Sequence, residues 1–214
     1  MNDTLEEKTT VPISEGTDET AYECGRKVPK ADKVRKTFTP DNLTKNLINV
    51  MRSVSNSKDD EVIETALAVF LHNLRLNSDN RTNTMVEYLN VLYERMETSN
   101  ATLGATIDLL PQNQRFYKPK AKVDFVMDKE LEQSITKLHF IIPTSARYKM
   151  TTLAVKLLAF ETYSNAVHPE RTSDYVIPDE QSEIVARITD GIARRMDDVS
   201  QIKGAKAIPE GVAE

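Results

Sequence analysis

The stretch from Pro143 to Pro169 constrains the fold more than any other part of the chain. Thr144 or Ser145 is placed to cap the first turn of a helix there, and the helix must end before the second proline. Apolar side chains cover more than half of the helical circumference. They are Tyr148, Met150, Leu153, Ala154, Leu157, Leu158, Phe160 and Val167. Because a helix of this kind is buried on several sides, the sequence predicts the central helix of a bundle.

Four charged residues interrupt this apolar helix. Arg147, Lys149 and Lys156 are either the solvated edge of a core helix or cations that reach a partner while their stems stay packed. Glu161 follows Phe160 on the apolar side, where a carboxylate needs a partner. We expect a buried guanidinium or ammonium group to hold this acid, and such a pair can orient the cation toward a phosphate.

Apolar residues at helical spacing recur through most of the remaining chain. They predict further helices from about 40 to 53, 59 to 76, 82 to 97, 103 to 110, 128 to 142 and 178 to 200. The first has Thr39 as its cap and Pro40 at its first position. The absence of Trp and the count of only 6 Gly disfavour a turn-rich β-sandwich. The sequence therefore predicts an all-α protein with one helical-bundle core at 36–200.

The two ends of the chain lack this periodicity. Residues 1–35 contain few apolar groups, so we expect a flexible N-terminal arm, and we expect a short C-terminal tail at 201–214. The formal net charge is −5, but the charges are segregated, with acidic residues concentrated in 1–23 and basic ones in 26–36. The average charge therefore says little about partners.

No feature of the sequence indicates an enzyme, a metal site or a cofactor. His72, His139 and His168 fall on separate predicted elements without a Cys or an acid at metal-ligand spacing. Cys24 is the only cysteine, so an internal disulfide is impossible, and the flexible arm expected around it lacks a scaffold to hold a base beside the thiol. There is no phosphate-binding glycine loop.

The sequence also indicates a compartment. It has no apolar run near the ~20 residues of a membrane span, and its acidic N-terminus is unlike a secretory signal. We therefore expect a soluble intracellular protein without a membrane partner.

The segment from Arg115 to Lys122 combines basic and aromatic residues. One interpretation is a solvated loop that contributes to solubility. The other is a groove for single-stranded nucleic acid, in which Lys118 and Lys120 neutralise phosphates while Phe116 or Tyr117 offers a flat face to a base. Both interpretations are compatible with the residues themselves.

Three islands of the sequence resemble the coat proteins of flexuous filamentous plant RNA viruses of the potexvirus and potyvirus type. The first runs from Lys156 through Ala159-Phe160-Glu161 to Pro169, where the family carries an Ala-Phe-Asp-aromatic-aromatic run, and Pro178-Asp179-Glu180 matches the Pro-led acidic helix that follows. The turn 77–85 and the segment 38–40 are the other two. The chain departs from the family in having Glu161 for Asp, Thr162 for an aromatic residue, and no Trp.

The resemblance implies a non-enzymatic structural protein that polymerises helically and encapsidates single-stranded genomic RNA through sequence-independent contacts, found in the virion and the host cytoplasm. It implies that the N-terminal arm docks on a neighbouring subunit. A Ser, an Arg and an acid line the RNA groove of such filaments, which by position implies Ser78, Arg115 and Glu161. The full set of expected RNA contacts is Ser78, Arg115, Lys118, Lys120, Arg147, Lys149, Lys156 and Glu161.

A protein of another class remains the alternative: a soluble helical adaptor that recruits other proteins through its arm and tail and binds no nucleic acid. This alternative accounts equally well for a bundle with disordered ends. It gives no role to Glu161 or to the basic-aromatic segment.

Overall fold

A computed structural model describes residues 22–23, 26–27, 32–78, 81–117, 122–142 and 149–206. Its helices are α1 (Asn42–Ser55), α2 (Asp59–Leu76), α3 (Thr82–Thr98), α4 (Asn100–Ile107), the 3₁₀ turn η1 (Gln112–Gln114), α5 (Lys129–Ile141), α7 (Met150–Val167) and α8 (Asp179–Lys206). The strands are β1 (Tyr22–Glu23), β2 (Arg26–Lys27), β3 (Lys33–Phe38) and β4 (Val123–Asp128). The described part of the chain is thus predominantly helical, and the predicted all-α class is confirmed.

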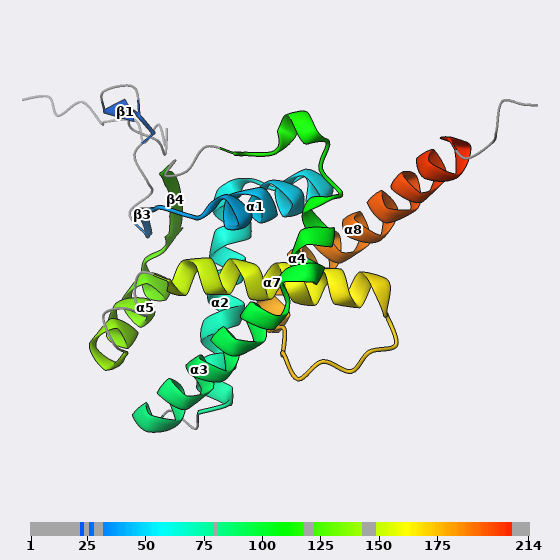
Figure 1. Cartoon of the computed structure of the whole chain (residues 1–214). Helices are drawn as coiled ribbons and strands as arrows, with labels where there is room; N and C mark the ends of the chain where they lie inside the picture. Colours follow the sequence, from blue (N-terminus) through cyan, green and yellow to red (C-terminus); the bar gives the residue numbers. More distant parts are fainter. Residues whose placement is uncertain are drawn as a thin grey trace, which may run out of the picture.

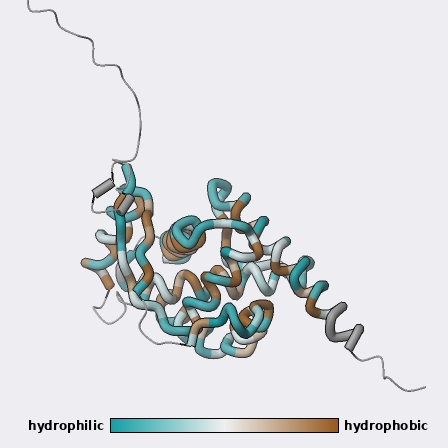
Figure 2. The backbone as a smooth tube through the Cα atoms, turned by 90° about the horizontal axis from the view of Figure 1, so that it is seen from above, coloured by the Kyte–Doolittle hydropathy of each residue, from teal (hydrophilic) through white to brown (hydrophobic). Residues whose placement is uncertain are grey.

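Helix α7 lies at the centre of the bundle, as predicted. It packs against α1, α2, α3, α4 and α8 (Figure 1). The side chains that its neighbours bury most completely include Ala154, Val155, Leu157, Leu158 and Ala159. Seen from above, many hydrophobic stretches of the chain are gathered in the body of the molecule (Figure 2). The predicted cap at Thr144 or Ser145 lies outside the described residues.

Helices α1 and α8 approach each other very closely. A Cβ atom added at Gly191 of α8 would lie 2.3 Å from the backbone oxygen of Val54, near the end of α1. Only glycine lets the two backbones come this close. The first and last helices of the bundle therefore pack directly on each other.

The start of α1 differs from the prediction. The N-cap is Asp41, not Thr39, because the Asp41 carboxylate accepts a hydrogen bond of 2.6 Å from the backbone N–H of Thr44. Burial alone would raise the pKa of Asp41, but hydrogen bonding to Thr44 and the ion pair with Lys156 outweigh it and leave this pKa below its ordinary value. Asp41 therefore joins the start of α1 to α7.

A short two-stranded sheet was not predicted. β3 pairs with β4 in an antiparallel register that runs from Lys33 opposite Asp128 to Phe38 opposite Val123. In β4, Val123, Phe125 and Met127 are buried while the residues between them are more exposed, which is the period of two expected for a strand. Rings of Phe38 and Phe125 meet edge to face at 5.8 Å.

The strand and the last helix also cross the expected domain boundaries. The boundary between arm and core, expected at residue 35, falls within β3, and α8 continues to Lys206, past its expected end near residue 200.

Among the described residues, no helix combines the length and the apolar character that crossing a bilayer demands.

Candidate nucleic-acid interface

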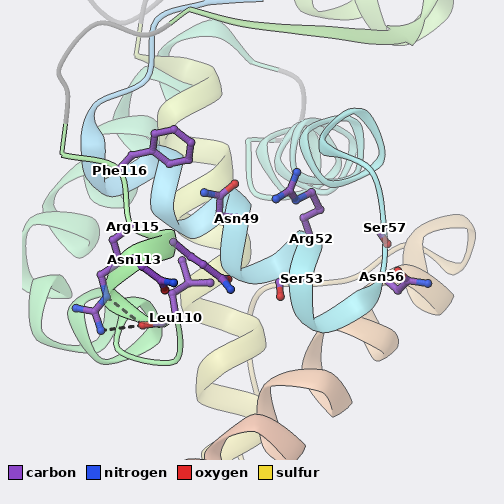
Figure 3. Close-up of a pocket in the computed structure, with 10 residues that line it drawn as sticks. Asn49, Arg52, Ser53, Asn56, Ser57, Leu110, Asn113, Arg115 and Phe116 are labelled. Carbon is purple, nitrogen blue, oxygen red and sulfur yellow. Dashed lines mark hydrogen bonds between the residues drawn. The ribbon is translucent and has the colours of Figure 1, made fainter.

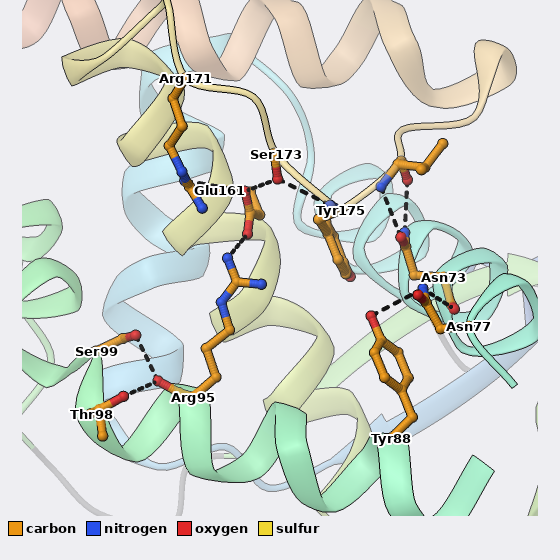
Figure 4. Close-up of polar contacts among 11 residues, drawn as sticks. Asn73, Asn77, Tyr88, Arg95, Thr98, Ser99, Glu161, Arg171, Ser173 and Tyr175 are labelled. Atoms are coloured by element: carbon orange, nitrogen blue, oxygen red, sulfur yellow. Dashed lines mark hydrogen bonds and ion pairs between the residues drawn. The ribbon is translucent and has the colours of Figure 1, made fainter. Parts of the chain in front are cut away.

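Glu161 is buried in the middle of the bundle, and arginines hold it as the sequence predicts. Its side chain is only 2% exposed, and Oε1 lies 2.5 Å from Nη2 of Arg95, on α3. Oε2 lies 3.4 Å from Nη1 of Arg171 and accepts a 2.7 Å hydrogen bond from the hydroxyl of Ser173 (Figure 4). The acid is buried as expected, but it has two guanidinium partners, and both are partly exposed where a buried cation was expected.

The two arginines share an aromatic neighbour as well as the acid. The guanidinium carbons of Arg95 and Arg171 lie 5.0 and 5.5 Å from the ring centroid of Phe160. Both distances are within the range of a cation–π contact. We call Arg95, Phe160, Glu161, Arg171 and Ser173 the α7 cluster.

The α7 cluster carries one net positive charge and is partly open to solvent. The side chains of Arg95 and Arg171 are 30% and 29% exposed, although their shared carboxylate is buried. A guanidinium has five N–H donors, so one bond to Glu161 leaves most of them free for another acceptor. The geometry suits a site where two oriented cations meet an anion.

The connector between α7 and α8 positions Arg171 and Ser173. Asn73 of α2 anchors this connector, because its side-chain amide donates to the Val176 carbonyl at 2.7 Å and accepts from the Val176 N–H at 2.8 Å. The Ser173 hydroxyl also accepts from the Tyr175 N–H at 3.1 Å. The buried Asn73 amide therefore fixes the backbone of the connector that carries Arg171 and Ser173.

Tyr175 lies next to this cluster in an unusual environment. Its side chain is buried, and its hydroxyl has no hydrogen-bond partner among the described residues. Burial, and to a lesser degree the proximity of Tyr88 and Glu161, raises the pKa of Tyr175 well above its ordinary value. The phenol therefore stays protonated and keeps one unused donor beside Arg95 and Glu161.

The structure does not bring Arg115 or Ser78 to Glu161. Nε and Nη2 of Arg115 donate to the Leu110 carbonyl at 3.1 and 3.0 Å, and Nη1 lies 3.0 Å from a carboxylate oxygen of Asp108. Ser78 is fully buried, and its hydroxyl faces the Arg75 carbonyl at 3.5 Å. The trio implied by the family resemblance is therefore not assembled: Glu161 pairs with Arg95 and Arg171 in its place.

Side chains of α1 hold the described half of the basic-aromatic segment. Asn46 donates to the Phe116 carbonyl at 3.2 Å and accepts from the Phe116 N–H at 2.7 Å, while Asn42 donates to the Tyr117 carbonyl at 3.3 Å. The ammonium group of Lys45 lies 4.0 Å from the ring centroid of Phe116. We call residues 115–117 the docked segment.

A polar cavity of about 700 Å³ opens between α1 and the docked segment (Figure 3). Its lining residues are Asn49, Arg52, Ser53, Asn56, Ser57, Leu110, Asn113, Gln114, Arg115 and Phe116. Most of them carry amide, hydroxyl or guanidinium groups, so this cavity is suited to a polar ligand and not to an apolar one.

The remaining predicted contacts are dispersed or lie outside the described residues. Lys156 forms a 2.9 Å ion pair with Asp41, so it serves as a bridge between α7 and α1. Lys149 is exposed at the start of α7. Lys118, Lys120 and Arg147 belong to the part of the chain that the structure does not describe.

Sequence reasoning did not identify Arg95 and Arg171 as partners of Glu161. Arg95 adjoins Met96, which belongs to the buried stripe of α3, so its position at the edge of that stripe was the available signal. Arg171 lies in a connector without periodicity, and no local pattern marks it. Within the described ranges, no three His, Cys, Asp or Glu side chains gather as a metal site would require.

No protein-family model matches the chain, and searches of curated proteins and of solved structures return no match.

Proposed function

We propose that this protein is the coat subunit of a flexuous filament and that it polymerises along single-stranded RNA. The observation that carries the proposal is the α7 cluster, in which a buried Glu161 orients Arg95 and Arg171. Phe160 and Glu161 of this cluster lie in the sequence island that resembles the coat proteins. The proposal contains no catalytic step, and its contacts are to phosphates.

The chemistry of the cluster supports phosphate binding. Two guanidinium groups that share one acid retain a net positive charge, and each presents a planar array of donors that matches phosphate oxygens. Phe160 keeps both groups in place through their flat faces. Because the cations are already oriented, little side-chain entropy remains to be lost when a phosphate binds.

In this proposal Arg95 takes the role that the family pattern first suggested for Arg115. The donors of Arg115 are used within its own loop, whereas Arg95 donates from one guanidinium nitrogen, to Glu161, among the described residues. The docked segment contributes the aromatic groups Phe116 and Tyr117, both exposed on the surface. Contacts to phosphates carry little base information, so RNA of any sequence is expected to bind.

The first experiment combines microscopy with a salt titration. The purified protein should form filaments in electron micrographs when single-stranded RNA is added. Its RNA affinity should fall with salt, with a slope of about −0.7 in log–log form for each phosphate neutralised. Monodisperse particles with no nucleic acid would instead favour the helical adaptor. An RNA affinity that salt does not change would contradict binding through phosphates.

The second experiment tests the α7 cluster. The double variant Arg95→Gln with Glu161→Gln keeps the net charge of the cluster, because it removes one positive and one negative charge. If Arg95 is the main phosphate contact, RNA affinity should fall about tenfold or more, and the salt slope should decrease by about 0.7. Circular dichroism checks that helix content is unchanged.

A matched control removes a cation elsewhere. Arg187→Gln changes an exposed residue of α8 that makes no ion pair among the described residues. Affinity should stay within about twofold of the unmodified protein. If Arg187→Gln weakens binding as much as the double variant does, the loss is not specific to the α7 cluster, and this site is wrong.

A further inference from the structure

The outer face of α3 carries an acidic stripe. Its exposed residues follow one another at helical spacing and are Asn83, Glu87, Asn90, Val91, Glu94, Glu97 and Thr98. The carboxylates of Glu87, Glu94 and Glu97 take part in no ion pair among the described residues. Val91 is 57% exposed in the middle of this stripe.

The outer face of α5 is its counterpart. Phe140 is 82% exposed, the largest exposure of any large hydrophobic side chain in the described part of the chain. Lys137 lies one turn before it and is also exposed, with no ion pair among the described residues. Among the described elements, the helix packs mainly against β3 and β4 (Figure 1), and Lys137 and Phe140 are exposed.

We propose that α5 of one subunit docks on α3 of a second copy of this chain, with the two helices antiparallel. The spacing on the two faces matches in that orientation. Lys137 precedes Phe140 by three residues, and Glu94 follows Val91 by three residues, which is about 4.5 Å along each axis. The register that places Phe140 on Val91 therefore also places Lys137 beside Glu94.

Exposure and charge both indicate a second copy as the partner. Phe140 and Val91 are both exposed in the single chain, so the two faces do not pack on each other within one subunit. A face with unpaired carboxylates around a valine complements a face with a lysine beside a phenylalanine. One ion pair on a surface contributes little by itself, so burial of the apolar pair Phe140 and Val91 supplies most of the affinity.

This contact is head-to-tail, because the two faces belong to different helices of the same chain. A contact of that kind leaves a free α5 at one end and a free α3 at the other, so it adds subunits indefinitely instead of closing. The inference rests on the proposed function, since it supplies one interface of the proposed filament. It is independent of the RNA contacts at the α7 cluster.

Sedimentation velocity of the full chain without RNA tests this interface. The concentration at which half of the subunits are associated should rise about tenfold or more for Phe140→Ala, which removes most of the apolar contact. Lys137→Glu and Glu94→Lys should each weaken association by several-fold. The matched control is Lys129→Glu, because it makes the same charge change on α5 outside the proposed register.

The charge variants also provide a rescue. A mixture of Lys137→Glu and Glu94→Lys subunits should associate better than either variant alone, because every junction between unlike subunits then pairs opposite charges. The double variant in one chain should recover as well. Weakening by Lys129→Glu equal to that by Lys137→Glu, a mixture without recovery, or assembly that stops at two copies would each overturn the docking of α5 on α3.

The outcomes separate this interface from the proposed function. Filaments on RNA with unchanged assembly of Phe140→Ala would contradict the interface and leave the coat function intact. An unmodified protein that stays monomeric at all concentrations and binds no RNA would contradict both. Assembly through α5 and α3 without any RNA binding would support the interface and contradict the coat function.

Discussion

The α7 cluster and the docked segment both place arginine next to phenylalanine, yet they use the arginine in opposite ways. Arg115 donates hydrogen bonds to the carbonyl of Leu110 and forms an ion pair with Asp108, so it stabilises its own loop. Arg95 and Arg171 share one buried carboxylate, and in the described part of the chain most of their other guanidinium donors make no hydrogen bond. The comparison teaches that the partner of an arginine, and not its sequence neighbours, decides whether it can serve a ligand.

The largest change in the free energy of unfolding is expected when the buried acid Glu161 is removed. Glu161→Ala leaves two neighbouring guanidinium groups without their counter-charge and opens a cavity in the bundle. Loss of one member of a buried ion pair typically costs about 3–5 kcal/mol. Urea unfolding followed by circular dichroism measures the change.

A matched acid on the surface provides the contrast. Among the described residues Glu170 pairs with His168 alone, and both side chains are mostly exposed. Glu170→Ala should therefore change the free energy of unfolding by less than about 0.5 kcal/mol. If Glu161→Ala is equally mild, the α7 cluster is not a buried, mutually dependent set of charges.

A smaller effect is expected at the docked segment. Asn46→Ala removes both hydrogen bonds that hold the backbone of Phe116, and should cost about 1–3 kcal/mol. It should also speed proteolytic cleavage near residues 115–117, because the segment detaches before the bundle unfolds. Asn49→Ala, on the same helix but without a hydrogen bond among the described residues, should change neither quantity. Equal cleavage rates in the two variants would show that Asn46 does not hold the segment.

Asp41 links the two regions, since it caps α1 and pairs with Lys156 of α7. Its pKa in the folded protein lies below the ordinary value of 3.8, so its contribution to stability is present above about pH 4 and is lost as pH falls through the folded pKa. Allowing for its exposure, this contribution is about 0.5–1 kcal/mol. Asp41→Asn should therefore be less stable than the unmodified protein at pH 7, and the difference should shrink at pH 3. A difference in stability that is the same at pH 7 and pH 3 would show that ionised Asp41 does not stabilise the fold.

The smallest expected change in stability is an increase and not a loss. Tyr175→Phe removes a buried hydroxyl that has no partner among the described residues. Removing such a group should leave stability unchanged or raise it by up to about 1 kcal/mol, measured as a shift of the urea midpoint. Tyr88→Phe is the control, because the Tyr88 hydroxyl accepts a 3.2 Å hydrogen bond from Asn77 and its loss should destabilise slightly. A clear loss of stability in Tyr175→Phe would indicate that this hydroxyl does have a partner.

Most of the helices could be predicted because their signals are local. The bounds Asp59–Leu76 of α2 agree with the prediction, since acidic residues open it and a continuous apolar stripe marks its length. Burial of Glu161 could be predicted for the same reason, because helical spacing places this residue, which follows Phe160, on the apolar side of the predicted helix.

Features that depend on distant partners could not be predicted in this way. Arg95 is 66 residues from Glu161, and only the packing of α3 on α7 brings them together. The pairing of β3 with β4 joins segments about 90 positions apart, and the charged sequence of β3 conceals its strand character. The alternation in β4 was visible in the sequence, but a six-residue strand is weak evidence without its partner.

The close approach of Gly191 to Val54 has a consequence for biosynthesis. The ribosome synthesises α1 early and α8 late. The apolar side of α1 therefore cannot pack against α8 until more than a hundred further residues have been translated. During that interval the nascent chain exposes surface that chaperones recognise. A stop codon ahead of α8 would make this transient state permanent, and the shortened product should accumulate as aggregates and not as subunits.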